Sequence, residues 1–464
     1  MNITFHGAAG EVTGSAYHLT TPEAGVLVDF GMFQGGRGAE ARNTLPHTLD
    51  PGHLDAVLLT HAHLDHVGRL PLLVKSGYHG PIHCTPATID LVGLILRDSA
   101  KVQSFDLNRT NRRRERAGQS PLEPLYTLAD VERTLGLLQA VPYHEFVPVA
   151  RGIRARFVEA GHMLGSTSIE LRVTEPGAAE KTVVFSGDLG PDGLPILRNS
   201  EPFGSADAVI LESTYGDRDH RGLDETKAEF RAILEQAIAR RAKIFVPSFA
   251  VGRTQQIIYH LMELFSSGAV PKFPVHIDSP MAIEATEIYG RHRELYDPES
   301  LDLGKLIEHG HLAEFVHYSQ SADDSRSLNR LTGPRLIMAG SGMCNAGRIL
   351  HHLRNNLFRP EAHIVIVGFQ GRGTLGRALV EKADRVRIFG EEIAVRATIH
   401  TLGGFSAHAG QTGLLKWFGA VAGSRPRVML THGEATPRAA LAQKIQSAHG
   451  ITAELPEAGS QVTI

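Results

Sequence analysis

The hydrophobic positions of this chain fall into short runs that alternate with longer stretches of helical periodicity. The short runs lie at 26–28, 56–60, 182–185, 208–211, 243–246, 335–338 and 428–430. The next residue is Asp, His, Ser, Glu, Pro, Ala and Thr, respectively. Short apolar runs that end at polar or turn-forming residues predict buried strands. At 252–261 and 346–354 the apolar residues recur at the spacing of an α-helix instead. The alternation predicts an α/β fold, in which functional groups gather beyond the strand ends.

Length and composition narrow the class of protein. A chain of 464 residues is too long for one ordinary core, so we expect two domains. Hydrophobic residues make up 42% and charged residues 21%, which is typical of a soluble globular protein, and no apolar stretch is long enough to span a bilayer. The net charge of -3 excludes a generally basic nucleic-acid-binding protein, although it allows a local basic groove. Cys84 and Cys344 form no disulfide framework, which predicts a cytoplasmic location.

Four candidate metal ligands follow the predicted strand 56–60, in the run His61-Ala62-His63-Leu64-Asp65-His66. A strand end fixes the backbone, so the loop beyond it can direct imidazoles and a carboxylate towards one point. These ligand types suit zinc and similar divalent ions. A polar loop rich in histidine is the alternative, because the chain has 25 histidines. The presence of Asp65 and His66 in register with the first two histidines favours a metal site.

Three more residues are candidate partners of this cluster. His162 lies in a turn flanked by glycines, Asp188 follows the predicted strand 182–185, and His432 follows 428–430. Taken singly, each is explained as a structural turn or strand-end residue. Taken together with the cluster, they indicate a shared metal centre. Metal-type residues occupy two blocks, about 29–188 and 400–432, and this distribution predicts one domain interrupted by another.

The order of these residues resembles the signature of the metallo-β-lactamase superfamily, H-x-H-x-D-H followed by separated His, Asp and His. The resemblance implies an αββα sandwich with two zinc ions, which manganese could replace. It assigns His61, His63 and His162 to one ion, Asp65, His66 and His432 to the other, Asp188 to both, and Asp29 to a supporting position. Aspartate at the bridging position is the choice of the superfamily's phosphoester hydrolases.

The segments 212–216, 404–408 and 430–434 resemble the three motifs of the β-CASP nucleases, and Gly340–Arg348 resembles another segment of that family. In these proteins an α/β domain is inserted into the metallo-β-lactamase fold. Members include the RNase J enzymes, the cleavage subunit of messenger-RNA 3′-end processing and DNA-repair nucleases. The resemblance therefore implies a β-CASP domain at 209–394, between two parts of a metallo-β-lactamase domain at 1–208 and 395–464.

The function implied by this resemblance is zinc-dependent hydrolysis of RNA by a metal-activated hydroxide, leaving 5′-phosphate and 3′-hydroxyl ends. Asp65, Asp188, Glu212 and His408 would be the catalytic residues, with His408 as general acid and Glu212 holding its imidazole. RNA is expected rather than DNA because the third motif carries His432, where DNA-repair members usually have valine. We expect single-stranded RNA as the partner and no association with a membrane. A homodimer is possible, and the choice between endo- and exonucleolytic action is left open.

Contacts to substrate phosphate have less distinctive patterns. Ser341 and Gly342 precede a predicted helix whose N-terminus could bind phosphate, although such glycine-rich turns are also common structural devices. His400 and Ser406 lie in or just before the second motif and could hold a backbone phosphate. Candidates for a basic lining of the cleft are Arg253, Arg348, Arg372 and Arg377. The run of arginines at 112–116 is more simply a solvated helix face, with RNA contact as the alternative.

The chain also departs from the family pattern. Gly410 stands where many members have an aspartate after Ser-Ala-His, so Glu212 becomes the more necessary support for His408. We expect neither the KH modules of archaeal relatives nor the extra C-terminal domain of RNase J. A β-CASP DNA nuclease, a small-molecule hydrolase of the superfamily and a catalytically silent RNA-binding subunit are the alternatives. The inserted motifs argue against the second, and the filled ligand positions argue against the third.

Overall fold

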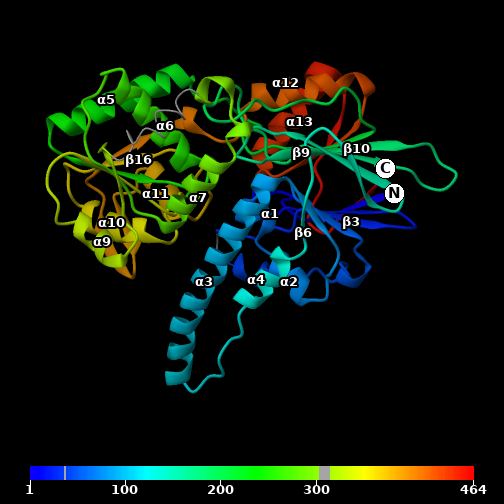
Figure 1. The fold of residues 1–464 in the computed structure, drawn as a ribbon, viewed down its shortest axis with the longest axis horizontal. Helices are drawn as coiled ribbons and strands as arrows, with labels where there is room; N and C mark the ends of the chain where they lie inside the picture. The colour runs from blue at the N-terminus through cyan, green and yellow to red at the C-terminus, as the bar shows by residue number, and fades with distance from the viewer. Residues whose placement is uncertain (36–37, 302–313) are drawn as a thin grey trace.

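The computed structural model describes residues 1–35, 38–301 and 314–464, which form two lobes (Figure 1). The first lobe contains two seven-stranded sheets. The order in one sheet is β22 (Gln461–Thr463), β1 (Asn2–Gly7), β2 (Ala16–Thr20), β3 (Gly25–Val28), β4 (Ala56–Leu58), β5 (Ile82–Cys84) and β6 (Leu138–Ala140). The order in the other is β21 (Ala453–Glu454), β20 (Arg427–Thr431), β11 (Ala208–Glu212), β10 (Lys181–Phe185), β9 (Thr167–Val173), β8 (Ile153–Glu159) and β7 (Phe146–Ala150).

The two sheets pack face to face around one apolar core. Phe5 and Val28 from the first sheet meet Phe157, Phe185 and Ile210 from the second in this core. The outer face of the first sheet is covered by α2 (Leu70–Lys75), α3 (Pro86–Arg116) and α4 (Leu128–Leu135). The outer face of the second is covered by α12 (Gln411–Val421) and α13 (Ala435–His449). The expected αββα sandwich is therefore confirmed.

The second lobe is a single sheet between two helical layers. Its strand order is β14 (Val316–Tyr318), β13 (Val275–Ile277), β15 (Arg335–Ala339), β12 (Lys243–Pro247), β16 (His363–Ile366) and β19 (Thr398–Thr401), and neighbouring strands are parallel. One layer contains α5 (Leu223–Ala239), α6 (Arg253–Ser266) and α7 (Pro280–Arg291). The other contains α9 (Ala322–Leu328), α10 (Arg348–Asn356) and α11 (Leu375–Val380). A hairpin of β17 (Arg385–Ile388) and β18 (Glu391–Ala394) lies beside the second layer.

The remaining helices of the described chain are short. They are α1 (Leu64–Val67) and the 3₁₀ turns Glu40–Arg42, Pro51–His53, Arg293–Leu295, Gly403–Phe405 and Ala422–Ser424. In the described parts of the chain, no helix combines the length and the apolar character needed to cross a membrane.

Every apolar run singled out in the sequence forms a strand, and both stretches of helical periodicity form helices, α6 and α10. The division between the lobes differs slightly from the expected one. The boundary expected after 208 falls inside β11, which pairs with β10 and β20 of the sandwich. The boundary expected after 394 precedes β19, which pairs with β16 of the second lobe. Sheet pairing therefore assigns a few residues at each crossing to the neighbouring lobe.

Candidate metal centre

The histidine-rich loop begins where β4 ends and bends sharply into α1. His63 caps α1, so Asp65 and His66 lie within its single turn while His61 remains on the extended chain before it. The loop is held against the neighbouring strand connection, because Ser15 N donates to Asp65 O at 2.9 Å. A Cβ atom built on Gly31 would lie 1.5 Å from the same carbonyl oxygen, so only glycine fits beneath the loop.

Three of the expected ligands meet at one point. Nε2 of His61 lies 3.1 Å from Nδ1 of His63, and Nε2 of His162 lies 3.0 Å from that same nitrogen. Asp188 Oδ2 lies 3.7 Å from His61 Nε2 and 3.6 Å from His162 Nε2. Ligand atoms from all four residues fall within 4.8 Å of one another.

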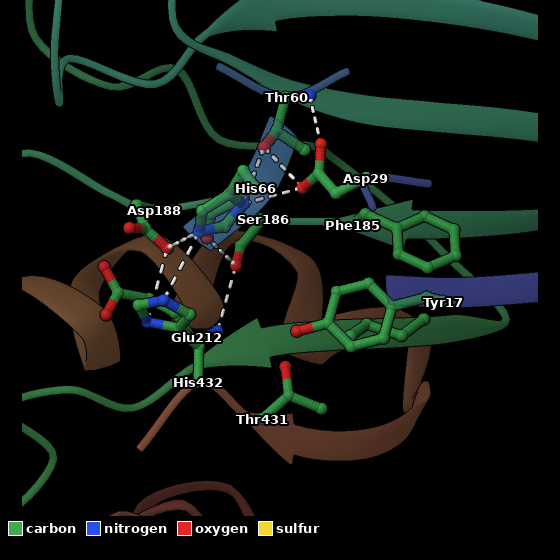
Figure 2. A pocket seen from close by; sticks show the side chains of 12 residues that line it. Tyr17, Asp29, Thr60, His66, Phe185, Ser186, Asp188, Glu212, Thr431 and His432 are labelled. Atoms are coloured by element: carbon green, nitrogen blue, oxygen red, sulfur yellow. Dashed lines mark hydrogen bonds and ion pairs between the residues drawn. The ribbon is translucent and has the colours of Figure 1, made fainter. Parts of the chain in front are cut away.

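A second group adjoins the first through the same aspartate. Nε2 of His432 lies 3.4 Å from Asp65 Oδ2 and 3.3 Å from His66 Nε2. Asp188 Oδ1 lies 3.5 Å from His66 Nε2 and 3.4 Å from His432 Nδ1. Asp188 thus lies between the two groups, at the place that the resemblance assigned to it. Figure 2 shows it beside His66 and His432 of the second group.

The donor set fits divalent metal ions. Asp188 Oδ1 is buried and has no hydrogen-bond partner among the described residues, an arrangement that is costly unless a cation lies against it. Burial lowers the pKa of His61 and His162 well below the usual range and that of His63 to about 4. These three imidazoles therefore present free lone pairs at neutral pH, which metal coordination requires. We call the residues whose side chains could together hold metal ions the metal-binding cluster: His61, His63, Asp65, His66, His162, Asp188 and His432.

The ring nitrogens that face away from the cluster are held by other groups. Asp29 accepts from Thr60 N at 2.8 Å with one oxygen, and its other oxygen accepts from His66 Nδ1 at 2.8 Å (Figure 2). His162 Nδ1 donates to the carbonyl of Ala407 at 2.9 Å. Such contacts fix the tautomer and direct the opposite nitrogen towards the metal.

A hydroxyl also holds His432, since its Nδ1, which lies 3.4 Å from Asp188 Oδ1, is 3.1 Å from the hydroxyl of Thr214. Thr60, Thr214 and the Ala407 carbonyl were not identified from the sequence. Hydroxyls and backbone carbonyls are too common to form a recognisable pattern. The only available signal was their position, next to the motifs at 61–66, 212–216 and 404–408.

Glu212 and His408 meet beside the metal-binding cluster. His408 Nδ1 lies 3.3 Å from Glu212 Oε1 and 3.8 Å from Asp188 Oδ2. Glu212 ends β11 and is fixed by the backbone N–H groups of Leu189, at 2.7 Å, and Thr214, at 3.2 Å. Burial alone would lower the pKa of His408, but the carboxylates of Glu212 and Asp188 outweigh it and raise the pKa to about 9. The His408 side chain is 17% exposed, so its ring is accessible to a bound molecule.

The place of the missing aspartate at Gly410 is filled from elsewhere. A Cβ atom on Gly410 would lie 2.6 Å from Asp219 Oδ1, and Asp219 accepts from Thr412 N and Oγ1 at the start of α12. This carboxylate caps a helix, and it is Glu212 that contacts the His408 ring.

Of the residues expected to contact substrate phosphate, some lie beside the metal-binding cluster and others bond elsewhere. Ser406 is buried beside the site, with its hydroxyl accepting from His408 N at 3.3 Å. Ser341 Oγ accepts from the N–H groups of Asn345 and Ala346 within its own loop. His400 lies inside β19, where its Nε2 is 2.9 Å from Nδ1 of His363. Within the described residues, no hydrogen bond or ion pair joins His400 to the metal-binding cluster.

Of the four arginines expected to line the cleft, three are paired with carboxylates. Arg348 bonds to Asp278 at 2.7 Å, Arg372 to Glu434 at 3.2 Å, and Arg377 to Glu381 at 2.6 Å. Arg253 is buried at the start of α6. A carboxylate thus offsets the positive charge of each of the first three, whereas Arg253 bonds to the amide oxygen of Gln256.

An exposed aromatic ring near the cluster was missed by the sequence analysis. Phe249 follows β12 and is 36% exposed, and its ring centroid lies 6.5 Å from that of His63. The ring lies over Gly342, where a Cβ atom would come within 2.5 Å of it, and near Gly368. Its position just beyond a strand end was the available signal. Glycines on two loops thus leave space for a flat, accessible surface beside the metal ligands.

Comparison with known proteins gives three consecutive family matches. The descriptions are metallo-beta-lactamase superfamily for residues 9–248, Beta-Casp domain for 254–379, and Zn-dependent metallo-hydrolase RNA specificity domain for 392–456.

Two relatives and one solved structure extend this result. Ribonuclease TTHA0252 of Thermus thermophilus is 40% identical over 100% of both chains. The transcription termination factor FttA of Methanosarcina mazei is 30% identical over 94% of this chain and 67% of its own length. A crystal structure of a protein of unknown function from Enterococcus faecalis covers 100% of this chain and 99% of its own, with a TM-score of 0.54 and 13% identity. The last match supports the fold alone.

Proposed function

Because the chain belongs to the β-CASP family of the metallo-β-lactamase superfamily, we propose that it is a zinc-dependent ribonuclease. It would hydrolyse RNA phosphodiester bonds and leave 5′-phosphate and 3′-hydroxyl ends. The observation that carries the proposal is the position of Asp188, which joins two groups of ligands and lies 3.8 Å from the charged imidazole of His408. The 40% identity to a ribonuclease over the full length supports RNA as the substrate.

In this proposal the metal-binding cluster would hold two zinc ions, or manganese in their stead. His61, His63 and His162 would hold one ion, Asp65, His66 and His432 the other, and Asp188 would contact both. Bound ions would supply a hydroxide nucleophile at neutral pH and neutralise charge on the phosphoryl group. Asp29 would keep His66 oriented through their 2.8 Å hydrogen bond.

His408 would act as the general acid. Departure of the sugar oxygen needs a proton, and His408 holds one on a ring that is buried beside the cluster yet partly accessible. Glu212 would keep that ring oriented and charged, since its own oxygens are fixed by two backbone N–H groups. Among the residues expected to contact substrate phosphate, Ser406 lies next to the general acid, because its hydroxyl accepts a hydrogen bond from His408 N. The other three, Ser341, Gly342 and His400, would contact phosphates of the RNA further from the cleaved bond.

The experiment combines metal analysis with an end-labelled single-stranded RNA. The wild-type protein should contain zinc and cut the RNA, with product ends mapped as 5′-phosphate and 3′-hydroxyl. His408→Ala should reduce cleavage by about 10²-fold or more while metal content stays unchanged. The matched control is His79→Ala, since His79 is exposed and its ring forms a hydrogen bond with the carbonyl of its neighbour Gly77. Loss of zinc from His408→Ala would instead make this residue a ligand.

A matched DNA strand tests the main alternative, and preferential DNA cutting would refute the ribonuclease proposal. RNA carrying a 5′-phosphate or a 5′-triphosphate distinguishes endonucleolytic from 5′-to-3′ exonucleolytic action. Internal cleavage of both the 5′-phosphate and the 5′-triphosphate RNA indicates endonucleolytic action. Mononucleotides released only from the 5′-phosphate RNA indicate 5′-to-3′ exonucleolytic action.

A further inference from the structure

Helix α3 extends far beyond the lobe from which it starts (Figure 1). It has 31 residues, and its buried positions run from Ala87 to Ala100 and stop there. From Lys101 to Arg116 every residue is exposed or only partly buried. At about 1.5 Å per residue, this outer part projects roughly 24 Å from the body of the protein.

Hydrogen bonds to the chain that follows the helix hold the projecting part in place. The chain that returns from its end lies along one face of the helix, where Asn111 and Leu122 exchange hydrogen bonds of 3.0 and 2.8 Å. Arg114 Nε donates to Ser120 O at 2.7 Å, and Gln103 Nε2 donates to Tyr126 Oη at 2.8 Å. Gln103, Asn111 and Arg114 are spaced as one helix face, and all three are partly buried.

The opposite face carries a different set of side chains. Val102, Phe105, Arg109, Arg112 and Arg116 follow one another at intervals of three and four, so they form a single stripe along the helix. All five are exposed, and Phe105 is 72% exposed. We call this stripe, together with the adjacent Arg113, the α3 stripe.

The arginines of the α3 stripe are uncompensated. Between 109 and 116 there are five arginines and one glutamate, in a chain whose net charge is -3. In the parts of the chain that the structure covers, Arg109, Arg112, Arg113 and Arg116 form no ion pair or side-chain hydrogen bond. Nearer the base of the same helix, Arg97 pairs with Glu132 at 2.7 Å. Such concentrated charge next to an exposed ring is suited to a flexible polyanion whose bases can stack.

The base of the helix contacts the loop that carries His162. The hydroxyls of Thr85 and Thr88 each donate to the carbonyl of Gly165 at 2.8 Å, three residues after His162. The helix itself is about 46 Å long, so its tip lies far from this loop.

We propose that the α3 stripe is a second binding site for single-stranded RNA, which holds the phosphate backbone at a distance from the cleavage site. The inference rests on the proposed function for the nature of the polymer, and it adds a length requirement. An RNA confined to the cleft does not reach the stripe, whereas a long RNA contacts both. The stripe thus selects long substrates and leaves the chemistry of the metal centre unchanged.

The test removes four charges of the stripe, with Arg109, Arg112, Arg113 and Arg116 each changed to Gln. The matched control changes Arg326, Arg354, Arg359 and Arg385 to Gln, because these four are exposed on the second lobe and pair with acidic residues. Both sets are built in the full chain carrying His408→Ala, so that RNA stays intact. Binding of fluorescent RNAs of about 8 and about 40 nucleotides is followed by anisotropy over a range of salt concentrations.

The stripe variant should bind the long RNA at least tenfold more weakly, with a salt slope smaller by about 0.7 for each phosphate that the arginines no longer neutralise. Binding of the short RNA and of the control variant should be unchanged. Phe105→Ala alone should weaken long-RNA binding several-fold with little effect on the slope.

Equal affinity and slope for the stripe variant and its control would overturn the inference. A change in oligomeric mass without a change in RNA affinity would also overturn it, and would assign the stripe to contact with a second copy of the chain. If the stripe binds long RNA while the wild-type protein cuts none, the ribonuclease proposal fails and the second RNA site stands.

Discussion

At the scale of single residues, the cluster depends on side chains that never face the metal ions. Asp29, at a backbone φ of 57°, bonds both the loop backbone at Thr60 and the ring of His66. The sequence could identify Asp29 through the family resemblance. It could not identify Thr214 or the Ala407 carbonyl, because these groups come next to the ligands only when distant segments pack together.

Replacing Asp29 tests this support. Asp29→Ala removes the acceptor of a buried backbone N–H and of His66 Nδ1, so we expect zinc affinity to fall about 10- to 100-fold. The unpaired N–H should also cost about 1–3 kcal/mol of stability. Competition with a zinc chelator and urea unfolding measure the two effects. Asp192→Ala, at an exposed position, is the control, and equal zinc affinity in both variants would contradict the support role.

Replacing Glu212 tests how His408 keeps its proton. Because the Glu212 carboxylate acts against burial and raises the pKa of His408, Glu212→Gln removes a negative charge and should lower that pKa. A general acid works only while protonated, so activity is present below the pKa of His408 and lost as pH rises through it. The alkaline limb of the kcat/KM profile should therefore move to lower pH, by about one unit or more. Glu434→Gln should leave the limb in place, and an unmoved limb in Glu212→Gln would exclude the charge coupling.

At the scale of elements, the strands were predictable where both faces of a strand are covered. β10, β12 and β15 lie inside their sheets and contain continuous apolar runs. The hairpin β17–β18 alternates exposed and buried residues and is rich in charge, so it gave no comparable signal. The boundaries between the lobes were missed by a few residues because a strand's sheet depends on its distant pairing partners, such as β20 for β11.

The loop between β4 and α1 depends on a glycine in a different element. Gly31→Ala would place a methyl group 1.5 Å from the carbonyl oxygen of Asp65, so the loop or the strand connection must shift. We expect loss of bound zinc and destabilisation of about 3 kcal/mol or more. Gly204→Ala is the matched control, since nothing lies within 4 Å of that position. Zinc content and thermal melting report both effects, and a variant that retains zinc and melts normally would show that the loop can yield.

At the scale of the whole molecule, the centre is assembled from both ends of the chain. β20 brings His432 next to β11, and β11 in turn lies beside β10, which leads to Asp188. The order of motifs allowed this arrangement to be predicted by resemblance. The projection of α3, by contrast, could not be predicted, because a polar helix on the surface and a polar helix extending from it have the same sequence pattern.

Removal of metal should therefore affect the sandwich more than the second lobe. Without ions, the lone pairs of His61, His63 and His162 face one another, and Asp188 Oδ1 has no hydrogen-bond partner among the described residues. Ligand binding to the folded state stabilises it by about 4 kcal/mol when zinc is at 1,000 times its Kd. Chelation should lower the melting temperature of the sandwich by several degrees, and added zinc should restore it.

Because β20 and β11 join the two parts of the sandwich around the ions, protection of backbone amides from hydrogen exchange should fall on chelation in these strands and persist in β12 and β15. Hydrogen exchange with and without chelator measures this difference, and equal loss in both lobes would show that the centre stabilises the whole chain instead.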